Sequence, residues 1–282
     1  MRGTMNSSTL LGITTFTYLF TMVLYFYYLF FRNQKLGVCI KIITVIGVLI
    51  HTAGLGLRWY ESYQMGYGHI PLSNMYEALV SLSWCTVLII LVMEQKFKTE
   101  IMGVFVFPLV SIAMAYASLS PNVRDEIEPL IPALQSNWLT YHVLTCFLGY
   151  AAFAVSFGAS IAYLIKGREA DVSSENSLLP EITILDEVIY KGVGVGFLLL
   201  GIGIITGAVW ANYAWGSYWS WDPKETWSLI TWLIYATFLH ARLTRGWRGK
   251  KTAILSIIGF CGVIFTFLGV NYLLSGLHSY ES

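Results

Sequence analysis

Charged residues are scarce in this chain of 282 residues. Asp, Glu, Lys and Arg make up 12% of it, whereas hydrophobic residues make up 56% and aromatic residues 16%. Average soluble domains are about 25% charged, so the composition excludes an ordinary water-soluble globular protein. The 17 basic and 16 acidic residues nearly cancel, to a net charge of +1. Because proteins that bind nucleic acids concentrate positive charge, nucleic acid is excluded as the main partner.

Cysteine is also sparse, and its spacing excludes two classes of site. No two cysteines form a CxxC pair, and each lies alone in an apolar run: Cys39, Cys85, Cys146 and Cys261. Zinc sites and disulfide frameworks need cysteines at closer and more regular spacing. We therefore interpret all four as small, buried hydrophobic residues.

Long runs without charge dominate what is present. A membrane-spanning helix needs about 20 mostly apolar residues, and eight charge-free stretches meet or approach that length. We predict an all-α integral membrane protein with about eight transmembrane helices in a single domain, residues 1–282. The helices are expected near 9–31, 37–57, 76–94, 100–119, 138–165, 192–213, 224–243 and 253–276. No small-x-small cleavage site follows the first of them, so we expect it to remain as a helix.

Lysine and arginine fall mostly in one set of alternate loops. Thirteen of the 17 are on one side, and the other side has four: Arg2, Arg58, Arg124 and Lys224. Because cytoplasmic loops collect Lys and Arg, we expect both termini on the outer side, in a periplasm or thylakoid lumen. The loops 58–75, 120–137 and 212–223 are expected there too. The longest polar insert, 167–190, is then cytoplasmic, and its composition favours a flexible linker or a partner contact.

Tryptophan is concentrated in one segment, residues 208–232, which holds six of the ten. An interfacial aromatic belt needs about one anchor per helix end, which accounts for Trp210 and Trp232 only. A dense aromatic surface on a loop suits a flat, apolar, polarizable ligand, and a porphyrin fits that description. The candidate ligand contacts are Trp210, Trp215, Trp219, Trp221, Asp222 and Trp227.

The acidic residues of this tryptophan segment have a local explanation. Asp222 precedes Pro223, and Glu225 lies three residues after Asp222. This is the pattern of a helix N-cap, a proline at the first helical position and a capping box. We therefore expect Asp222 and Glu225 to start a helix rather than to catalyse a reaction.

Two of the five histidines are expected at the level of the tryptophan segment. His142 follows Trp138 near the outer start of one helix, and His278 follows the outer end of the last helix. An isolated interfacial histidine is usually bonded to solvent or backbone. At a common depth beside the tryptophans, however, two imidazoles suit the opposite faces of one heme iron. We therefore predict His142 and His278 as iron ligands.

The other three histidines lie elsewhere in the chain. His240 lies sixteen residues after Lys224, about 24 Å further along a helix. It is either a second heme ligand near the cytoplasmic face or a helix-end histidine beside Arg242. His51 is expected about 10 Å below the outer surface, a poor depth match for His240, so we interpret it as a buried, hydrogen-bonded residue or a group behind a ligand. His69 is interpreted as a plain loop histidine.

Five segments resemble one branch of the WWD family of heme-handling membrane proteins, the CcsA/ResC branch (also called CcsB) of system II cytochrome c biogenesis. They are WGSYWSWDPKETWSLITWLIYATFLH, RWYES, HIPLSNMYEAL, SNWLTYHV and GVNYLLSGLHSY. The resemblance implies that His142 and His278 ligate an external heme b beneath the tryptophan loop. It also implies that His240 ligates a second heme inside the membrane, whose other ligand comes from a CcsB/ResB-like membrane partner.

The resemblance further implies an activity of the holocytochrome c synthase, or heme lyase, type. Such a protein receives heme, moves it outward and holds it for thioether attachment to the CxxCH motif of an apocytochrome c. A thioredoxin-like protein keeps the thiols reduced. No residue is predicted as a general acid or base, because positioning supplies the catalysis. The expected location is a bacterial inner membrane or, alternatively, a thylakoid membrane.

Three other functions stay open from the sequence. A heme exporter or delivery protein without ligation activity has the same site. A cytochrome b-like electron-transfer subunit needs paired ligands at matched depths, which His51 and His240 do not offer. A transporter needs polar residues inside its spans and broken helices in matching halves, neither of which is evident.

Overall fold

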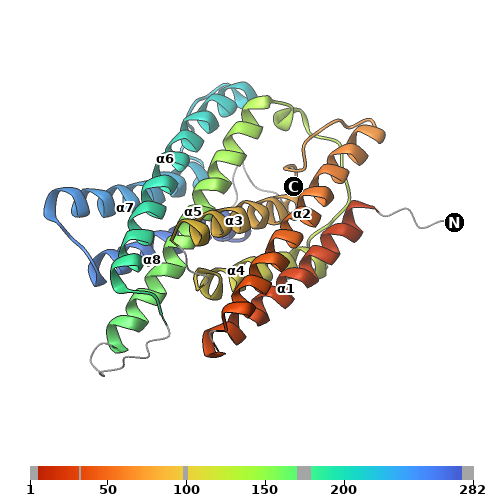
Figure 1. Ribbon diagram of the computed structural model, residues 1–282. Coiled ribbons are helices and arrows are strands. Elements are labelled where there is room, and N and C mark those ends of the chain that lie inside the picture. Colours follow the sequence, from red (N-terminus) through yellow and green to blue (C-terminus); the bar gives the residue numbers. More distant parts are fainter. Residues whose placement is uncertain (1–5, 32, 98–100, 170–178, 275–282) are drawn as a thin grey trace. The chain divides into compact units, whose positions relative to one another are not determined.

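The computed structural model describes residues 6–31, 33–97, 101–169 and 179–274 (Figure 1). All regular structure in these ranges is helical, so the predicted all-α class is confirmed. The long helices are α1 Ser7–Phe31, α2 Gln34–Gln64, α3 Met75–Phe97, α4 Met102–Leu119, α5 Asn137–Glu169, α6 Ile182–Trp215, α7 Pro223–Arg245 and α8 Lys250–Ile264. Shorter elements are the 3₁₀ turn η1 Pro132–Leu134, the π-helix η2 Phe265–Gly269 and α9 Val270–Leu273.

Seven helical segments of the described chain are long and apolar enough to cross a membrane. They are α1 to α6 and the continuous run of α8, η2 and α9 over Lys250–Leu273. The predicted span at 224–243 coincides with α7, which has Glu225 in its first turn and two arginines in its last turn and is not among the seven. The chain is therefore a multi-pass membrane protein. The crossing of α7 and the sides of the two termini stay predictions.

The chain divides into two compact units, and the assignment of residues 1–282 to a single domain stays a prediction. Unit 1 is residues 1–135, with α1 to α4, and unit 2 is residues 136–282, with α5 to α9. Between α4 and α5 the only regular element is η1, and the same stretch contains Pro121, Pro129 and Pro132. Because proline lacks a backbone N–H and interrupts helices, the two helical runs are separated there. Hydropathy alone does not register such a division.

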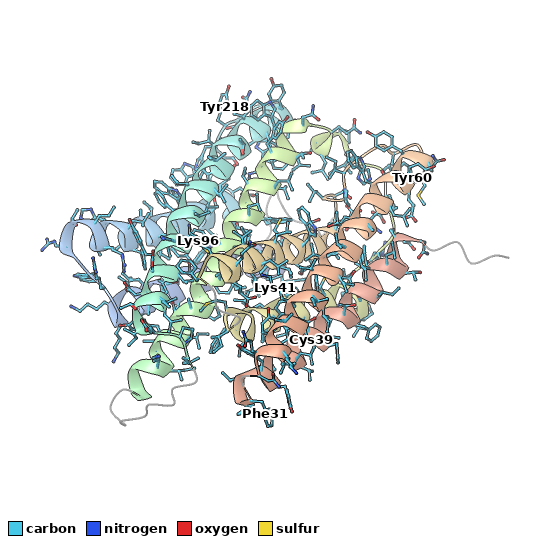
Figure 2. The ribbon with its side chains drawn as sticks, viewed as in Figure 1. Phe31, Cys39, Lys41, Tyr60, Lys96 and Tyr218 are labelled. Atoms are coloured by element: carbon cyan, nitrogen blue, oxygen red, sulfur yellow. The ribbon has the colours of Figure 1, made fainter. Side chains whose placement is uncertain are left out.

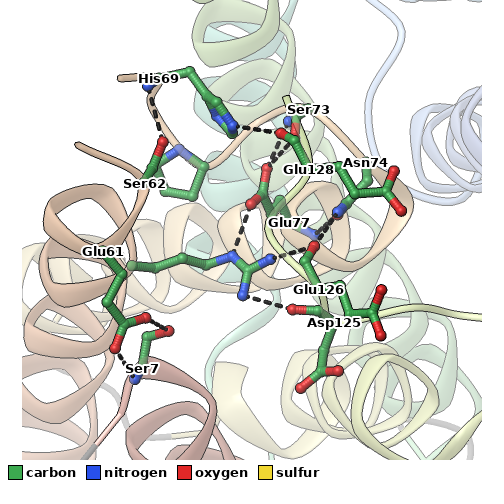
Figure 3. A network of polar contacts seen from close by, with 12 residues as sticks. Ser7, Glu61, Ser62, His69, Ser73, Asn74, Glu77, Asp125, Glu126 and Glu128 are labelled. Carbon is green, nitrogen blue, oxygen red and sulfur yellow. Dashed lines mark hydrogen bonds and ion pairs between the residues drawn. The ribbon is translucent and has the colours of Figure 1, made fainter. Parts of the chain in front are cut away.

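A buried polar network lies at the ends of α2 and α3 in unit 1 (Figure 3). Arg58, which is 2% exposed, donates from Nε to Glu77 Oε1 at 2.7 Å. Its other two nitrogens donate to the carbonyl oxygens of Asp125 and Glu126 at 2.8 and 3.1 Å. The second carboxylate oxygen of Glu77 accepts from the backbone N and the Oγ of Ser73, both at 2.7 Å. The network ties the segment after α4 to both helices.

Helices α5 and α6 of unit 2 pack side by side (Figure 1). The approach is close because α6 presents a row of glycines to α5, as small residues do in many membrane helix pairs. A Cβ built on any of four of them would lie within 2.5 Å of an α5 side chain: Gly192, Gly196, Gly203 and Gly207. Helix α8 packs on α5, and α7 packs on both α6 and α8.

Helix α6 begins ten residues before its predicted start, so the insert predicted at 167–190 is shorter than expected. Residues 170–178 of that insert lie outside the described residues. The composition of the insert favoured a linker, but Asp186 forms a two-point ion pair with Arg242, at 2.9 and 2.6 Å. Glu187 pairs with a lysine one turn further along the helix. Part of the polar composition therefore belongs to the charge-paired first turns of α6.

Two of the four cysteines depart from the interpretation as buried residues. Cys85 and Cys146 are buried, whereas Cys39 and Cys261 are exposed on the isolated chain. Figure 2 shows Cys39 on α2 and Phe31 at the end of α1. Side chains exposed on helices this apolar face lipid in a membrane, and a thiol behaves there as a small hydrophobic group. The apolar runs around these cysteines reflect a lipid surface as well as a protein core.

Candidate functional site

An open pocket in unit 2 contains one of the predicted iron ligands. Its empty space, mouth included, is about 790 Å³. The wall is built by α5, α6, α7, the loop between α6 and α7, and η2. The lining residues are His142, Val143, Cys146, Phe147, Tyr150, Ile204, Gly207, Ala208, Tyr218, Trp219, Lys224, Glu225, Ser228, Thr266 and Phe267. A histidine, a tryptophan and a lysine thus share one largely apolar cavity.

The imidazole of His142 is held in a defined orientation on α5. Its Nδ1 lies 2.7 Å from the carbonyl oxygen of Gly203 on α6. A carbonyl oxygen only accepts, so Nδ1 carries the proton and the neutral ring has its lone pair on Nε2. The indole of Trp210 is stacked beside the ring, with centroids 6.0 Å apart and planes 16° from parallel. Metal-ligating histidines commonly have this pattern, with the second ring N–H bound to a fixed acceptor.

The tryptophans of the segment pack in separate ring contacts, one of which joins Trp232 to Phe197 of α6 with centroids 4.5 Å apart. Trp210 is 4% exposed and meets Trp215 edge to face at 5.0 Å. Trp219 lines the pocket and meets Trp221 edge to face at 5.8 Å. Trp227 packs instead against Phe265 of the π-helix, with centroids 4.2 Å apart. The structure therefore brings Trp210 and Trp219 to His142 and its pocket, and places Trp227 on the neighbouring helix.

Trp221 has a backbone conformation that bulky residues rarely adopt. Its φ is +59°, in the left-handed region, and its side chain is 69% exposed. Such a conformation costs about 1–3 kcal/mol and persists where the surroundings impose it. The Glu225 carboxylate accepts from Ser220 N at 2.8 Å and from Asp222 N at 3.2 Å, so it holds the residues on both sides of Trp221.

The same contacts form the cap of α7. Asp222 accepts from Lys224 N at 3.0 Å, and the Asp222 and Glu225 side chains complete a capping box with Pro223 at the start of the helix. The predicted helix start is therefore confirmed. Glu225 combines this capping role with its contacts to the neighbouring loop.

Lys224 adds a positive charge to the pocket, a role that its sequence context did not predict. Burial lowers the pKa of its ammonium group to about 8, and the nearby Asp222 carboxylate opposes that shift. Lys224 lies in the first turn of α7, outside the seven membrane-crossing segments. A half-buried ammonium group in an apolar pocket favours an anionic ligand group.

The π-helix η2 contributes to the pocket wall, and no sequence pattern predicted it. Thr266 and Phe267 of η2 line the pocket, and Phe267 meets Phe147 of α5 edge to face at 5.9 Å. Asn271 donates from Nδ2 to the Phe267 carbonyl oxygen at 2.6 Å, a contact that joins η2 to the first turn of α9. Single π turns inside α-helices are frequent at functional sites.

No other histidine of the described part of unit 2 lines this pocket. His278 lies outside the described residues. His240 is exposed near the end of α7, two residues before Arg242. In unit 1, His51 is fully buried with Nδ1 3.1 Å from Tyr18 Oη, as expected for a hydrogen-bonded core histidine. His69 is 6% exposed, and its ring nitrogens lie 3.1 and 2.9 Å from the carbonyl oxygens of Ile70 and Glu128.

Comparison with known sequences gives the chain a family. A family model described as cytochrome C assembly protein matches residues 72–278. The cytochrome c biogenesis protein CcsA of Heterosigma akashiwo (strain NIES-293 / 8280G21-1) is 41% identical over 299 residues, covering 93% of this chain and 91% of its own. The CcsA proteins of Synechococcus sp. (strain CC9605) and Guillardia theta are 38% and 39% identical, covering 88% and 95% of this chain and 88% and 94% of their own.

Comparison with solved structures agrees on the fold. The chain is similar to the cytochrome c heme lyase CcmF with a TM-score of 0.71 and 16% identity, over 95% of this chain and 48% of CcmF. This chain thus spans about half the length of CcmF, and at that identity the likeness concerns the fold alone. The sequence matches are closer and extend over nearly the whole chain. The chain therefore belongs to the CcsA family of cytochrome c biogenesis proteins.

Proposed function

We propose that this protein is the heme-binding membrane subunit of a system II cytochrome c synthase. The single observation that carries the proposal is the pocket of unit 2. His142, in the tautomer of a metal ligand, lines this pocket together with Trp219 of the tryptophan segment and Lys224. Heme is the substrate that combines an iron to be ligated, a flat aromatic ring and two carboxylates.

In this proposal His142 and His278 are the two axial ligands of an external heme b. The chain length supports the second assignment. From Phe267 at the pocket to Leu273, six residues of helix rise about 9 Å, and the five residues to His278 span up to about 17 Å. The chain is thus long enough to return to the pocket. Trp210, Trp215, Trp219, Trp221 and Trp227, with Asp222 shaping the loop, form the aromatic surroundings of that heme.

The position of Lys224 suggests how the heme is oriented. Propionate carboxylates and vinyl groups lie on different edges of the porphyrin, and an ammonium group attracts the carboxylates. If the propionates face Lys224, the vinyl edge is turned away from the polar end of the pocket. That edge must be accessible, because the two thiols of the apocytochrome CxxCH motif have to reach it.

The reaction itself needs positioning rather than an acid or base from this chain. Each thiol adds across a vinyl double bond, so that a C–S bond forms and the thiol hydrogen ends on the vinyl group. No net oxidant is consumed, and a thioredoxin-like partner keeps the thiols reduced. Holding heme and peptide in reacting geometry converts an encounter of separate molecules into a local event, an effect of several kcal/mol.

His240 is the proposed ligand of a second, inner heme on the path from the cytoplasm. Its side chain is exposed near the end of α7 in unit 2, where a partner chain has access to it. A CcsB/ResB-like membrane partner supplies the opposite ligand in this proposal. The family members in algae and in Synechococcus favour a thylakoid membrane over the bacterial inner membrane that we expected.

The test is a spectrum and a transfer assay on the full chain purified with and without its CcsB/ResB-like partner. We expect heme in the complex and its covalent transfer to a reduced CxxCH peptide. His142→Ala should abolish transfer, and added imidazole should restore part of it. Tyr141→Ala, an exposed neighbour on the same helix, is the matched control. Heme bound without transfer would indicate a delivery protein, and heme retained through redox cycles without transfer would indicate a cytochrome b-like subunit.

A further inference from the structure

Three features of α6 converge on the imidazole of His142. The carbonyl oxygen of Gly203 accepts from Nδ1 at 2.7 Å, and it also accepts from Thr206 Oγ1 at 3.1 Å. Gly207, one turn further along, lies against the ring, and Trp210 stacks beside it. Residues spaced by four and then three positions share one helix face. The contact is therefore built into a single stripe of α6.

Gly207 leaves the space that the imidazole occupies. A Cβ at this position would lie 2.5 Å from His142 Nδ1 and 2.7 Å from Cε1, closer than real side chains approach. One turn earlier, a Cβ at Gly203 would lie 2.5 Å from the Sγ of Cys146, the α5 residue that follows His142 by one turn. The two glycines thus form a notch in α6 that receives the α5 side chains. Any larger residue at 207 must displace the imidazole or push the two helices apart.

The acceptor on Nδ1 also has chemical consequences. A backbone carbonyl fixes the proton on Nδ1 without carrying a negative charge. The neutral ring therefore donates the Nε2 electron pair to a metal with moderate strength. A carboxylate in the same place would make the imidazole a stronger and more permanent ligand. Moderate ligation suits a heme that is a substrate and has to leave with the product.

We propose that Gly203, Gly207 and Trp210 are positioning residues that set the tautomer and rotation of His142 so that Nε2 faces the pocket. This inference rests on the proposed function, because it concerns the ligand of the substrate heme. It assigns the α6 glycine notch a role in ligation beyond helix packing. Gly192 and Gly196 serve helix packing only, because the α5 side chains beside them are not histidines.

The experiment compares Gly207→Ala with Gly194→Ala in the full chain with its CcsB/ResB-like partner. The control position is on the same helix, and a Cβ there meets no atom within 4 Å. We expect Gly207→Ala to lower the affinity of the outer site for heme b about 10- to 100-fold, the usual cost of disturbing a group that orients a metal ligand. It should also shift the Soret maximum and reduction potential of the residual heme. Gly194→Ala should match the parent in all three measurements.

Imidazole rescue separates positioning from damage to the fold. Free imidazole is not attached to α5 and can settle without the notch. The variant His142→Gly should therefore recover heme with imidazole to the same degree whether or not Gly207→Ala is also present. Failure of the double variant alone to recover would mean that Gly207 acts on the fold, which overturns the inference.

The two proposals fail in distinguishable ways. If His142→Ala keeps its outer heme with the parent spectrum, the ligand assignment under the proposed function is wrong. If His142→Ala loses that heme while Gly207→Ala keeps parent affinity, spectrum and potential, the ligand assignment stands and the positioning role is wrong.

Discussion

Polar side chains in the two units are satisfied in different ways. In unit 1, the buried Arg58 guanidinium donates hydrogen bonds to three protein acceptors. The ring nitrogens of His69 lie within hydrogen-bond distance of two carbonyl oxygens. In unit 2, His142 bonds α6 through one ring nitrogen while its ring, together with Lys224, lines an open pocket. Polar groups enclosed by protein acceptors hold the fold. Polar groups gathered around a cavity are placed to contact a ligand.

The sharpest test of this comparison uses one histidine from each unit. His240→Ala in the complex with the CcsB/ResB-like partner should lose the inner heme entirely, because an axial ligand is removed. His51→Ala should keep that heme and lose only stability, because His51 is buried against Tyr18. Difference spectra and heme content per complex measure both. Loss of the inner heme in His51→Ala alone would assign ligation to unit 1 and break the comparison.

A second prediction concerns the enclosed ion pair of unit 1. Glu77→Ala leaves the Arg58 guanidinium buried without its carboxylate, which costs about 3–5 kcal/mol. Thermal unfolding in detergent should show a clear loss of stability, while heme content per folded molecule stays at the parent value. Glu128→Ala is the matched control, because only its backbone carbonyl joins the network. Equal unfolding midpoints in the two variants would contradict a structural role for the pair.

The tryptophans should show graded effects that follow their positions. Each aromatic contact contributes roughly 0.5–1.5 kcal/mol beyond its buried area, so single Trp→Phe changes should be mild. Among them Trp219→Phe should lower heme occupancy most, because Trp219 lines the pocket, and Trp227→Phe should act mainly on stability through Phe265. A quadruple variant at the following positions should lose most of its heme: Trp215, Trp219, Trp221 and Trp227. Normal heme content in that variant would mean that these residues form an interfacial aromatic belt and do not bind heme.

The smallest effect is expected from Lys224. Lys224→Met should weaken heme binding about 5-fold, the value of a hydrogen bond with a net contribution of roughly 1 kcal/mol, because the ammonium group is only half-buried. Heme whose propionates are esterified should bind parent and variant equally, because the charge partner is gone. Lys250→Met, exposed at the start of α8, serves as control. An equal loss with both hemes would place the effect in the α7 cap and not in a charge pair.

The pH dependence follows from the same group. With a pKa of about 8, Lys224 is charged below pH 8 and loses its charge above it. Affinity for heme should therefore be greatest below pH 8 and fall above it in the parent. In Lys224→Met the affinity should show no such fall. Titration of binding across this range measures the difference.

Local patterns were predictable where neighbours in sequence are also neighbours in space. The capping box at Asp222 and Glu225 depends on residues three apart, and it forms as predicted. The all-α class follows from long apolar runs. The start of α6 was misjudged because Asp186 is paired with Arg242, a residue 56 positions away, and no local pattern reveals that partner.

The candidate site likewise has a part that local sequence patterns predict and a part that depends on contacts between distant residues. His142 and the tryptophans were proposed as site residues from residue type and expected depth. Their arrangement in the structure depends on the close approach of α6 to α5 at Gly203 and Gly207. The apolar sequence of α6 does not predict which glycines make that approach. The roles of Arg58 and Glu77 were also missed, since a charged residue near a helix end is usually read as a loop residue.

The wide turn at Phe265–Gly269 has a consequence for everything downstream. A π turn holds one more residue than an α turn, and each residue of an α-helix advances the phase by about 100°. The last described helical turn, with Val270 and Asn271 buried, is therefore rotated by that amount relative to an unbroken α8. Deleting one residue between 265 and 269 would reverse the rotation and turn Val270 and Asn271 to a different side of the helix. The extra residue thus acts as a register shift that decides which side chains of this turn are buried.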